Sequence, residues 1–384
     1  MIDPGFFHSL LAARGTDFFT GVPDSLLKSF CAWLADKAME ENHIIAVNEG
    51  AALALASGYH LATGKIPLVY MQNSGLGNAV NPLLSLADSD VCGIPMILLV
   101  GWRGEPGVKD EPQHLKQGKA TRALFEAMGT PYWVLSGRED EVQGQLAECY
   151  TQILKNNAPA ALVARRDTFA PYAGAANADS AGFDMSREEA IEEIILSSSP
   201  DDVFVATTGM ASRELYELRE KHGHGHDRDF LVVGAMGHAS SLALALALQK
   251  QDLSVNCLDG DGAALMHLGG LAAIGARKPA NLKHIVLNNG AHDSVGGQPT
   301  IARQIDLLGI ARSVGYALAC RVQTLEELRL VSAETSAWGK NGIKGPLFME
   351  VRVRKGGRKD LGRPKSGPAE NKDIFMRFMA KGKS

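Results

Sequence analysis

The chain has 384 residues, of which 45% are hydrophobic and 21% charged, a balance typical of a globular protein that buries a large core. Its 39 basic and 43 acidic residues leave a net charge of −4, so no global basic field exists to attract nucleic acid or an anionic membrane. We therefore expect neither as a partner.

Two features of the sequence bear on where the protein works. The 5 cysteines are dispersed and mostly lie in apolar runs, which predicts free buried thiols in a reducing compartment and no disulfide framework or zinc site. Residues 1–8 lack the basic start and long apolar run of a signal peptide, and no apolar run approaches membrane-spanning length. We expect a soluble cytoplasmic protein.

Short β-rich apolar runs alternate with longer Ala/Leu-rich helical patterns along the first half of the chain. The strand candidates are apolar on both faces, as in a parallel sheet that is covered by helices on each side. This alternation predicts an α/β fold with mostly parallel sheets flanked by helices. Strands are expected at 17–21, 44–47, 67–71, 96–101, 132–135 and 161–164, and helices at 25–39, 50–63, 78–88 and 139–155.

The alternation lapses over residues 168–184, which are rich in Ala, Gly and small polar residues and are expected to link two domains, 1–167 and 185–353. It resumes with a helix capped by Ser186, where Glu189 three residues on completes a capping box. Further strands are expected at 203–207, 230–233, 254–258, 284–287 and 347–353, and helices at 186–196, 213–222, 239–249, 263–276 and 325–338.

Two polar segments have less specific interpretations. Residues 354–384 begin as a basic stretch poor in apolar residues, which predicts a solvated tail or, alternatively, a lid or subunit clamp. The segment His222-Gly-His-Gly-His226 resembles a metal-binding tract, but it lies among glycines in a polar stretch without a carboxylate pattern. We expect it to be a surface loop.

The segment Gly260-Asp-Gly262 follows a predicted strand, and 25 residues later, after 263 to 287, the chain reaches Asn288-Asn289. A parallel strand, helix and strand return the chain to the same edge of a sheet, so these two segments are expected side by side. A carboxylate, an amide oxygen and a backbone carbonyl suit Mg²⁺, which commonly completes its shell from phosphates. The glycines and the free N–H groups of the next helix favour a bound diphosphate. A chance pair of ordinary turns is the alternative.

This spacing resembles the binding motif of thiamine-diphosphate enzymes. The resemblance implies two thiamine-diphosphate-binding-fold domains, a pyrimidine-binding one first and a diphosphate-binding one second. It implies that Asp261, Asn289 and the carbonyl of Ala291 bind Mg²⁺. Met236 is the candidate for the bulky apolar residue that bends the cofactor, with ordinary core filling as the alternative. The candidates for contact with the cofactor are Gly209, Met236, Gly260, Asp261, Gly262, Ala263 and Asn288.

Thiamine-diphosphate enzymes also need a glutamate that faces the aminopyrimidine ring of the cofactor, where a buried carboxyl shares a proton with a ring nitrogen. Val47-Asn-Glu-Gly-Ala-Ala-Leu53 places Glu49 at the end of a strand, entering an apolar helix, and it resembles this element. Glu49 is therefore the candidate catalytic carboxyl. The alternative is a glutamate at a helix N-terminus, stabilised by the helix dipole.

The chain is too short for the third domain that most pyruvate-type decarboxylases carry between their two cofactor-binding halves. Over nearly its whole length it resembles the compact phosphonopyruvate and sulfopyruvate decarboxylases. The strings that carry the resemblance are Gly21-Val-Pro-Asp-Ser25, Gln72-Asn-Ser-Gly-Leu-Gly-Asn78, Gly101-Trp-Arg-Gly104 and Ala291-His-Asp-Ser-Val-Gly-Gly-Gln-Pro-Thr300.

This resemblance implies a thiamine-diphosphate- and Mg²⁺-dependent, non-oxidative decarboxylation of 3-phosphonopyruvate to phosphonoacetaldehyde and CO₂. Decarboxylation of sulfopyruvate to sulfoacetaldehyde is the alternative. A fused chain is expected to favour the phosphonate, because sulfopyruvate decarboxylases usually divide the two halves between two polypeptides. In the family, the glutamate of one subunit faces the diphosphate site of another, which implies a homodimer or higher homo-oligomer.

Two alternatives of other classes have less support. A dinucleotide-dependent oxidoreductase would carry a Gly-x-Gly-x-x-Gly pattern followed by an acidic residue, which the sequence lacks. A non-catalytic thiamine-fold subunit would lack the catalytic glutamate, so Glu49 argues against it.

The remaining candidates concern proton transfer and the substrate. Asp24 resembles an active-site aspartate of pyruvate decarboxylases, and a helix N-cap is the alternative. His114 matches the second of their paired histidines, although Gln113 stands where the first would be; it is a candidate proton handler or else an exposed loop histidine. A phosphonate requires cationic or amide partners. The candidates for substrate contact are Arg213, which is alternatively a solvated charge, and His292, Ser294, Gln298 and Thr300.

Overall fold

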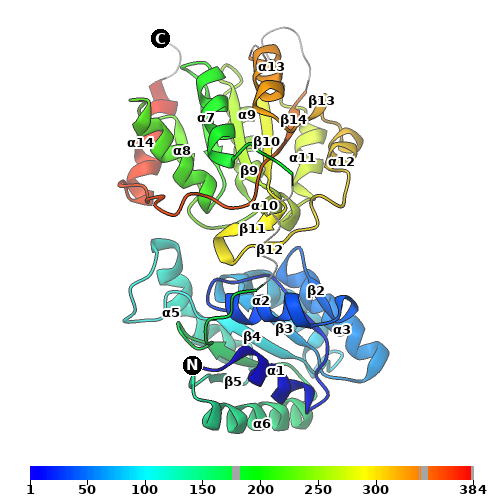
Figure 1. Cartoon of the computed structure of the whole chain (residues 1–384). Coiled ribbons are helices and arrows are strands. Elements are labelled where there is room, and N and C mark those ends of the chain that lie inside the picture. The colour runs from blue at the N-terminus through cyan, green and yellow to red at the C-terminus, as the bar shows by residue number, and fades with distance from the viewer. Residues whose placement is uncertain (175–181, 337, 339–344, 382–384) are drawn as a thin grey trace. The chain divides into compact units, whose positions relative to one another are not determined.

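The structure, a computed structural model, describes residues 1–174, 182–336, 338 and 345–381 (Figure 1). The chain forms two compact units, one of Met1–Ala178 with Ser294–Gln298 and one of Asp179–Asp293 with Pro299–Ser384. The predicted linker falls partly on residues 175–181, which lie outside the described residues, so the predicted domain boundaries stay predictions.

The first unit is built on a parallel six-stranded sheet with the order β2-β1-β3-β4-β6-β5. Its strands are β1 (Phe19–Gly21), β2 (His43–Ile45), β3 (Leu68–Gln72), β4 (Ile97–Gly101), β5 (Tyr132–Val134) and β6 (Ala160–Ala164). Its helices are α1 (Pro4–Ala12), α2 (Lys28–Lys37), α3 (Glu49–Thr63), α4 (Leu76–Pro82), α5 (Pro112–Ala127) and α6 (Glu139–Asn156).

Both faces of this sheet are buried. Leu68 and Tyr70 of β3 pack into one apolar cluster, whereas Val69 and Met71 pack into the cluster on the other face. This arrangement explains why the strands are apolar at successive positions and confirms the predicted parallel α/β architecture. The sequence did not predict α1 and α5. Helix α5 carries few large apolar residues and shows no clear helical period.

The second unit contains a parallel six-stranded sheet with the order β13-β14-β10-β9-β7-β8 and a two-stranded sheet, β11-β12. Its strands are β7 (Val203–Ala206), β8 (Asp229–Leu231), β9 (Val255–Gly260), β10 (Leu282–Asn288), β11 (Ala291–His292), β12 (Gln298–Pro299), β13 (Leu318–Val322) and β14 (Leu347–Arg352). Its helices are α7 (Arg187–Ser197), α8 (Met210–Lys221), α9 (Ala239–Gln249), α10 (Asp261–Met266), α11 (Gly270–Arg277), α12 (Leu307–Val314), α13 (Leu325–Thr335) and α14 (Pro368–Lys381).

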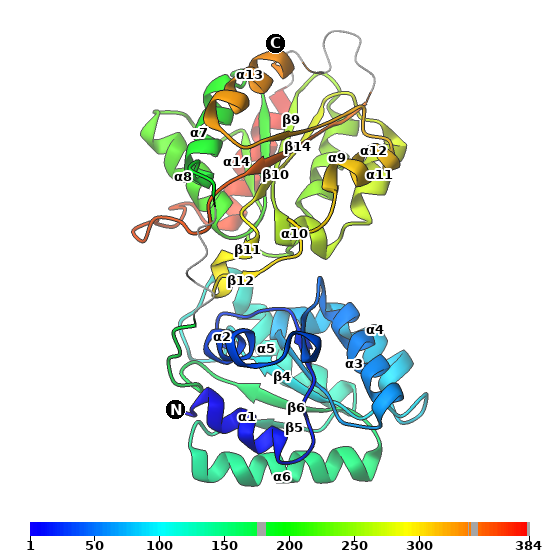
Figure 2. The same cartoon turned by 45° about the vertical axis from the view of Figure 1, so that its right-hand side comes forward.

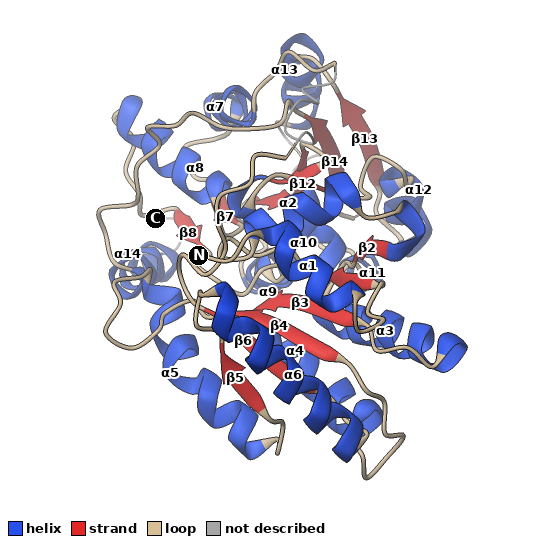
Figure 3. Ribbon diagram, turned by 60° about the horizontal axis from the view of Figure 1, so that its bottom comes forward, coloured by secondary structure: helices blue, strands red, loops and turns tan. Residues whose placement is uncertain are grey.

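Helices flank the six-stranded sheet in this unit as well, and Figure 2 and Figure 3 show, in each unit, the strands lying between helices. The predicted capping box of Ser186 and Glu189 at the start of α7 is present. The single helix predicted over 263–276 is wrong, because the chain forms α10 and α11 with a break before the glycine pair at 269–270, where helix propensity is low.

The basic segment after β14 is bound to the second unit along its described part. Asn371 of α14 accepts from the backbone N–H of Leu231 (3.1 Å) and donates to the carbonyl of Asp229 (2.8 Å), so it satisfies the open edge of β8. Phe375 packs against Phe230 with 5.7 Å between ring centroids. The solvated-tail interpretation therefore does not hold for this part of the chain.

Among the described residues, none of the helices combines the length and the apolar character that a membrane crossing requires.

Candidate active site

Asp261 and Asn289 leave the second sheet at neighbouring points. Asp261 is the first residue of α10, directly after β9, and Asn289 directly follows β10. These strands are parallel neighbours in which Gly260 pairs with Leu287, so both side chains emerge at the same edge of the sheet. The structure thus brings the two halves of the predicted motif together.

Asp261 is a buried carboxyl with a neutral side-chain hydrogen-bond donor. Only 2% of it is exposed, and the hydroxyl of Thr300 donates to its Oδ2. Within the described part of the chain, no basic side chain forms an ion pair with it. Burial raises the pKa of Asp261 to about 7, because a carboxylate away from water is costly. Together with the amide oxygen of Asn289 and the carbonyl of Ala291 it offers oxygen donors, a set that fits Mg²⁺.

Gly262 lies tightly between two other candidates. A Cβ at this position would be 2.7 Å from Cε1 of His292 and 3.4 Å from Cε of Met236, so a glycine is required for this approach. Burial lowers the pKa of His292 to about 4, which leaves its imidazole neutral at neutral pH. The structure places Met236 beside the motif, and its role in bending the cofactor stays a prediction.

Two glycines occupy equivalent places after neighbouring strands. Gly209 is the N-cap of α8 after β7, with a φ of 100°, and Gly260 is the N-cap of α10 after β9. Ala263 is buried in the first turn of α10. Backbone N–H groups at such helix starts are available to an anion.

The side chain of Asn288 is engaged inside the protein. Its Nδ2 donates to Oε1 of Glu350 (2.8 Å), and its Oδ1 accepts from the backbone N–H of Gly290 (3.1 Å). Asn288 therefore shapes the turn that carries Asn289, and its side chain offers little to a cofactor.

The neighbouring acid, Asp259, faces the interior. Its Oδ2 lies 3.4 Å from Nε2 of His284, whose Nδ1 is 3.1 Å from the hydroxyl of Tyr316. Cys257 is close to both groups, and this trio is the one cluster of potential metal ligands within the described ranges. Burial raises the pKa of the Cys257 thiol well above its usual range, and all three side chains are fully buried in the core.

The histidine tract after α8 is bound to neighbouring side chains of the second unit. His222 lies 2.6 Å from Glu192, and His226 lies 2.8 Å from Glu220 while it stacks on Tyr216 with 4.0 Å between centroids. No metal-ligand cluster includes these histidines in the part of the chain that the structure describes. The expected loop after α8 is present, although its histidines are half-buried.

In the first unit, Glu49 is the first residue of α3, directly after the N-cap Asn48. It is 5% exposed, and Nδ2 of Asn78 donates to its Oε2 (2.7 Å). Gly75 lies so close that a Cβ there would collide with the carboxyl group. Glu49 is thus held by a neutral donor and by close packing. Both neighbours lie in the string Gln72-Asn-Ser-Gly-Leu-Gly-Asn78, but neither was named as a site residue.

Asp24 lies in the turn after β1 and is fully buried. Its Oδ1 accepts from Nε2 of Gln72 (2.6 Å) and its Oδ2 from the backbone N–H of Leu26 (2.9 Å). Burial raises the pKa of Asp24. The N-cap of α2 is Leu27, so the alternative interpretation of Asp24 as the cap of that helix is wrong.

His114 lies in the first turn of α5 and is half-buried, so its interpretation as an exposed loop residue is wrong. Burial and the nearby Arg103 lower its pKa. Arg103 was not among the predicted site residues, although it lies in a string that carries the resemblance. It binds Asp110 (Nε to Oδ2, 2.8 Å) and donates to the hydroxyl of Ser25 (2.8 Å).

The substrate candidates are in different surroundings. Arg213 is half-buried on α8, and Ser294 is exposed in the turn after β11. Gln298 is 3% exposed, and neither polar atom of its amide has a hydrogen-bond partner among the described residues. The Thr300 hydroxyl donates a hydrogen bond to Asp261, so the predicted contact of Thr300 with the substrate has no support.

Comparison with known proteins decides the family. The N-terminal TPP binding domain of thiamine pyrophosphate enzymes matches residues 6–123, and the C-terminal TPP binding domain matches residues 207–351. A phosphonopyruvate decarboxylase from Streptomyces hygroscopicus is 34% identical over 386 residues, covering 96% of this chain and 92% of that protein. The chain belongs to the phosphonopyruvate decarboxylase family of thiamine pyrophosphate enzymes. Membership confirms the predicted fold of two cofactor-binding domains and the predicted cofactor, thiamine diphosphate.

Two further relatives bear on the substrate. A phosphonopyruvate decarboxylase from Streptomyces viridochromogenes is 34% identical over 384 residues, which cover 96% of this chain and 93% of that protein. A sulfopyruvate decarboxylase from Methanosarcina acetivorans is 29% identical over 341 residues, 83% of this chain and 84% of its own length. That relative also spans both halves, so a fused chain alone does not exclude sulfopyruvate as the substrate.

The packing around Glu49 can be tested with two neighbouring glycines. Gly75→Ala should lower the free energy of unfolding by about 1–3 kcal/mol, because the added methyl group overpacks against the Glu49 carboxyl. Gly77→Ala is the matched control, since a Cβ there meets nothing within 4 Å. Urea unfolding of both variants gives the comparison, and equal stabilities would show that Gly75 is not needed for the placement of Glu49.

Proposed function

We propose that the chain catalyses the thiamine-diphosphate- and Mg²⁺-dependent decarboxylation of 3-phosphonopyruvate to phosphonoacetaldehyde and CO₂. The observation that carries the proposal is the similarity to two phosphonopyruvate decarboxylases over 96% of the chain, joined to the presence of Glu49 and of the Asp261 cluster. A non-catalytic subunit would not require Glu49 to be buried and held by a neighbouring amide.

When bound, thiamine diphosphate supplies a nucleophilic carbon for the 2-keto group and an electron sink for the pair released as CO₂ leaves. The residues that would hold the diphosphate through Mg²⁺ are Asp261, Asn289 and the carbonyl of Ala291. Their oxygen donors support this assignment, and among the described residues no basic side chain forms an ion pair with Asp261.

Glu49 would hold the proton that is shared with a ring nitrogen of the cofactor. Nδ2 of Asn78 donates to Oε2 of this carboxyl and so holds its orientation for that exchange. Asp24 and His114 are the candidates for returning a proton to the product. Burial raises the pKa of Asp24, which makes its protonated form available at a higher pH than for an exposed aspartate.

The phosphonate group would be bound by a small set of side chains. Arg213 brings charge, and the unpartnered amide of Gln298 is a buried donor that a substrate oxygen would satisfy. Ser294 offers a hydroxyl from the same turn. His292 is neutral at neutral pH and so contributes a hydrogen bond and no charge.

The decisive experiment compares two substrates. With thiamine diphosphate and Mg²⁺ present, kcat/KM should be higher for 3-phosphonopyruvate than for sulfopyruvate, measured by CO₂ release and aldehyde formation. A preference for sulfopyruvate would instead establish the function named for the Methanosarcina relative. Turnover of neither keto acid would contradict the proposed function.

Glu49→Gln should retain cofactor binding and lose roughly 10²–10⁴-fold in kcat, because the amide cannot exchange the proton that the carboxyl does. Glu41→Gln, at an exposed position, is the control and should turn over normally. Binding is read by calorimetric titration and kcat by CO₂ release. Near-full activity of the Glu49 variant would remove Glu49 from the mechanism.

We also propose that the active form is a homodimer or a larger homo-oligomer, as the arrangement in the family implies. Sedimentation velocity with thiamine diphosphate and Mg²⁺ should give at least the mass of a dimer. A monomer that is fully active at the concentration of the measurement would contradict this.

A further inference from the structure

The orientation of the Asn289 amide is fixed by a carboxylate that the mechanism does not use. Nδ2 of Asn289 donates to Oδ2 of Asp293 (2.6 Å), while its Oδ1 accepts from the backbone N–H of Ala291 (3.1 Å). A carboxylate only accepts hydrogen bonds, so the amide must turn its NH₂ group toward Asp293 and its oxygen away from it. Asp293 thereby determines which atom of Asn289 is offered to a cation.

Asp293 is itself held by a buried arginine. Nη1 of Arg187 donates to the same Oδ2 (3.0 Å), and the other edge of the guanidinium binds Glu214 through Nε (2.7 Å) and Nη2 (3.0 Å). Arg187 is 6% exposed and Glu214 is 1% exposed. A buried, two-sided guanidinium with both edges occupied has a single orientation, so it fixes Asp293 more firmly than a surface lysine would.

The C-terminal segment supplies the remaining support. The backbone N–H of Gly356 donates to Oδ2 of Asp293 (3.0 Å). The next residue, Gly357, passes so close to the ion pair that a Cβ would lie 3.2 Å from Nη2 of Arg187 and 2.9 Å from Cε of Met210. Three donors from separate parts of the second unit therefore meet on one oxygen of Asp293.

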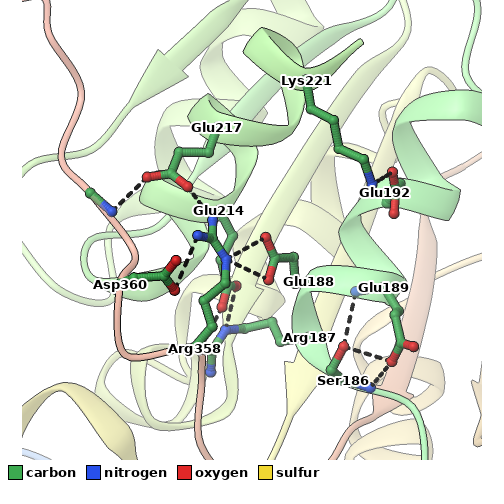
Figure 4. A network of polar contacts seen from close by, with 11 residues as sticks. Ser186, Arg187, Glu188, Glu189, Glu192, Glu214, Glu217, Lys221, Arg358 and Asp360 are labelled. Atoms are coloured by element: carbon green, nitrogen blue, oxygen red, sulfur yellow. Dashed lines mark hydrogen bonds and ion pairs between the residues drawn. The ribbon is translucent and has the colours of Figure 1, made fainter.

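Beyond Gly357, this segment is fastened to α7 and α8. Figure 4 shows Arg358 reaching Glu188 of α7 and Glu217 of α8, beside the pair of Arg187 and Glu214. Farther along the chain, Lys365 binds Glu220 (2.9 Å). The basic residues of the segment thus match acidic residues on these helices, and this match keeps Gly356 against Asp293.

We propose that Asp293 is a positioning residue for the Mg²⁺ ligand Asn289, and that Arg187 and the C-terminal segment hold Asp293 in place. The inference rests on the proposed function to the extent that Asn289 is a metal ligand there. Residues that orient ligands in this way typically account for roughly 10–100-fold in metal affinity.

The test measures Mg²⁺ affinity and not turnover. Apoprotein with saturating thiamine diphosphate is titrated with MgCl₂ in a calorimeter. Asp293→Ala should weaken Mg²⁺ binding by roughly 10–100-fold. Asp293→Asn should weaken it less, because an amide oxygen still accepts from the same donors. Asp373→Ala, which removes an exposed carboxylate of α14, is the control and should bind like the wild type.

The contribution of the C-terminal segment is read in the same titration. Arg358→Ala should weaken Mg²⁺ binding, by less than Asp293→Ala, because Gly356 loses one of the contacts that keep it in place. Arg138→Ala is the matched control, a surface arginine of the first unit that also binds two acidic side chains. Unchanged affinity for Arg358→Ala would remove the segment from the proposal.

A merely structural role for Asp293 predicts a different pattern. In that case Asp293→Ala would lower the unfolding temperature of the apoprotein but leave the Mg²⁺ affinity of the folded fraction within about twofold of the wild type. That result would overturn the proposal. If Asp293→Ala fails to fold, Asp293→Asn decides by the same criterion. A wild-type chain that binds Mg²⁺ and cofactor but decarboxylates neither keto acid contradicts the proposed function and leaves this result standing.

Discussion

The parallel pairing of β9 with β10 is the constraint on which the candidate metal site depends. Backbone hydrogen bonds set Gly260 opposite Leu287. Asp261, one residue after Gly260, and Asn289, two residues after Leu287, therefore lie at the same edge of the sheet. The first unit uses the same rule. Because β1 lies between β2 and β3, the turn with Asp24 emerges next to Gln72 on one side and near the strand that leads to Glu49 on the other.

The carboxyls of the candidate site differ from several of the framework in their partners. Three buried carboxyls of the framework have arginine partners, Glu214 with Arg187, Asp229 with Arg219 and Glu350 with Arg321, and a fourth, Asp259, faces His284. Glu49, Asp24 and Asp261 are equally buried, yet their side-chain partners are the neutral groups of Asn78, Gln72 and Thr300. A buried carboxyl without a fixed cation is free to bind a metal ion or to exchange a proton, which is what the proposed chemistry asks of these three.

The sequence predicted those parts of the fold and of the site that depend on patterns of neighbouring residues. Runs of apolar residues located the twelve strands of the two large sheets except β13. The spacing of one motif predicted that Asp261 and Asn289 lie side by side, whereas Glu49 was singled out by the family resemblance. The helices that were missed, such as α5 and α14, carry few large apolar residues or follow a basic stretch, so their period is weak. The contacts that hold Asp293 could not be predicted for another reason. Arg187 lies 106 residues from Asp293 in the sequence, and Gly356 lies 63 residues from it. Nothing local in the sequence marks such pairs, because only the folded sheet brings them together.

The C-terminal segment illustrates how composition alone misleads. A basic stretch poor in apolar residues is usually solvated, and each of its exposed ion pairs contributes little to stability because water and salt screen it. The segment is nevertheless anchored at both ends by hydrogen bonds: Gly356 donates to the half-buried Asp293, and the buried Asn371 satisfies the edge of β8. The ion pairs of Arg358 and Lys365 fix the path between these two ends, and that of Arg358 helps to keep Gly356 in place. The segment is therefore part of the second unit's framework, and its first anchor is the carboxylate that orients Asn289.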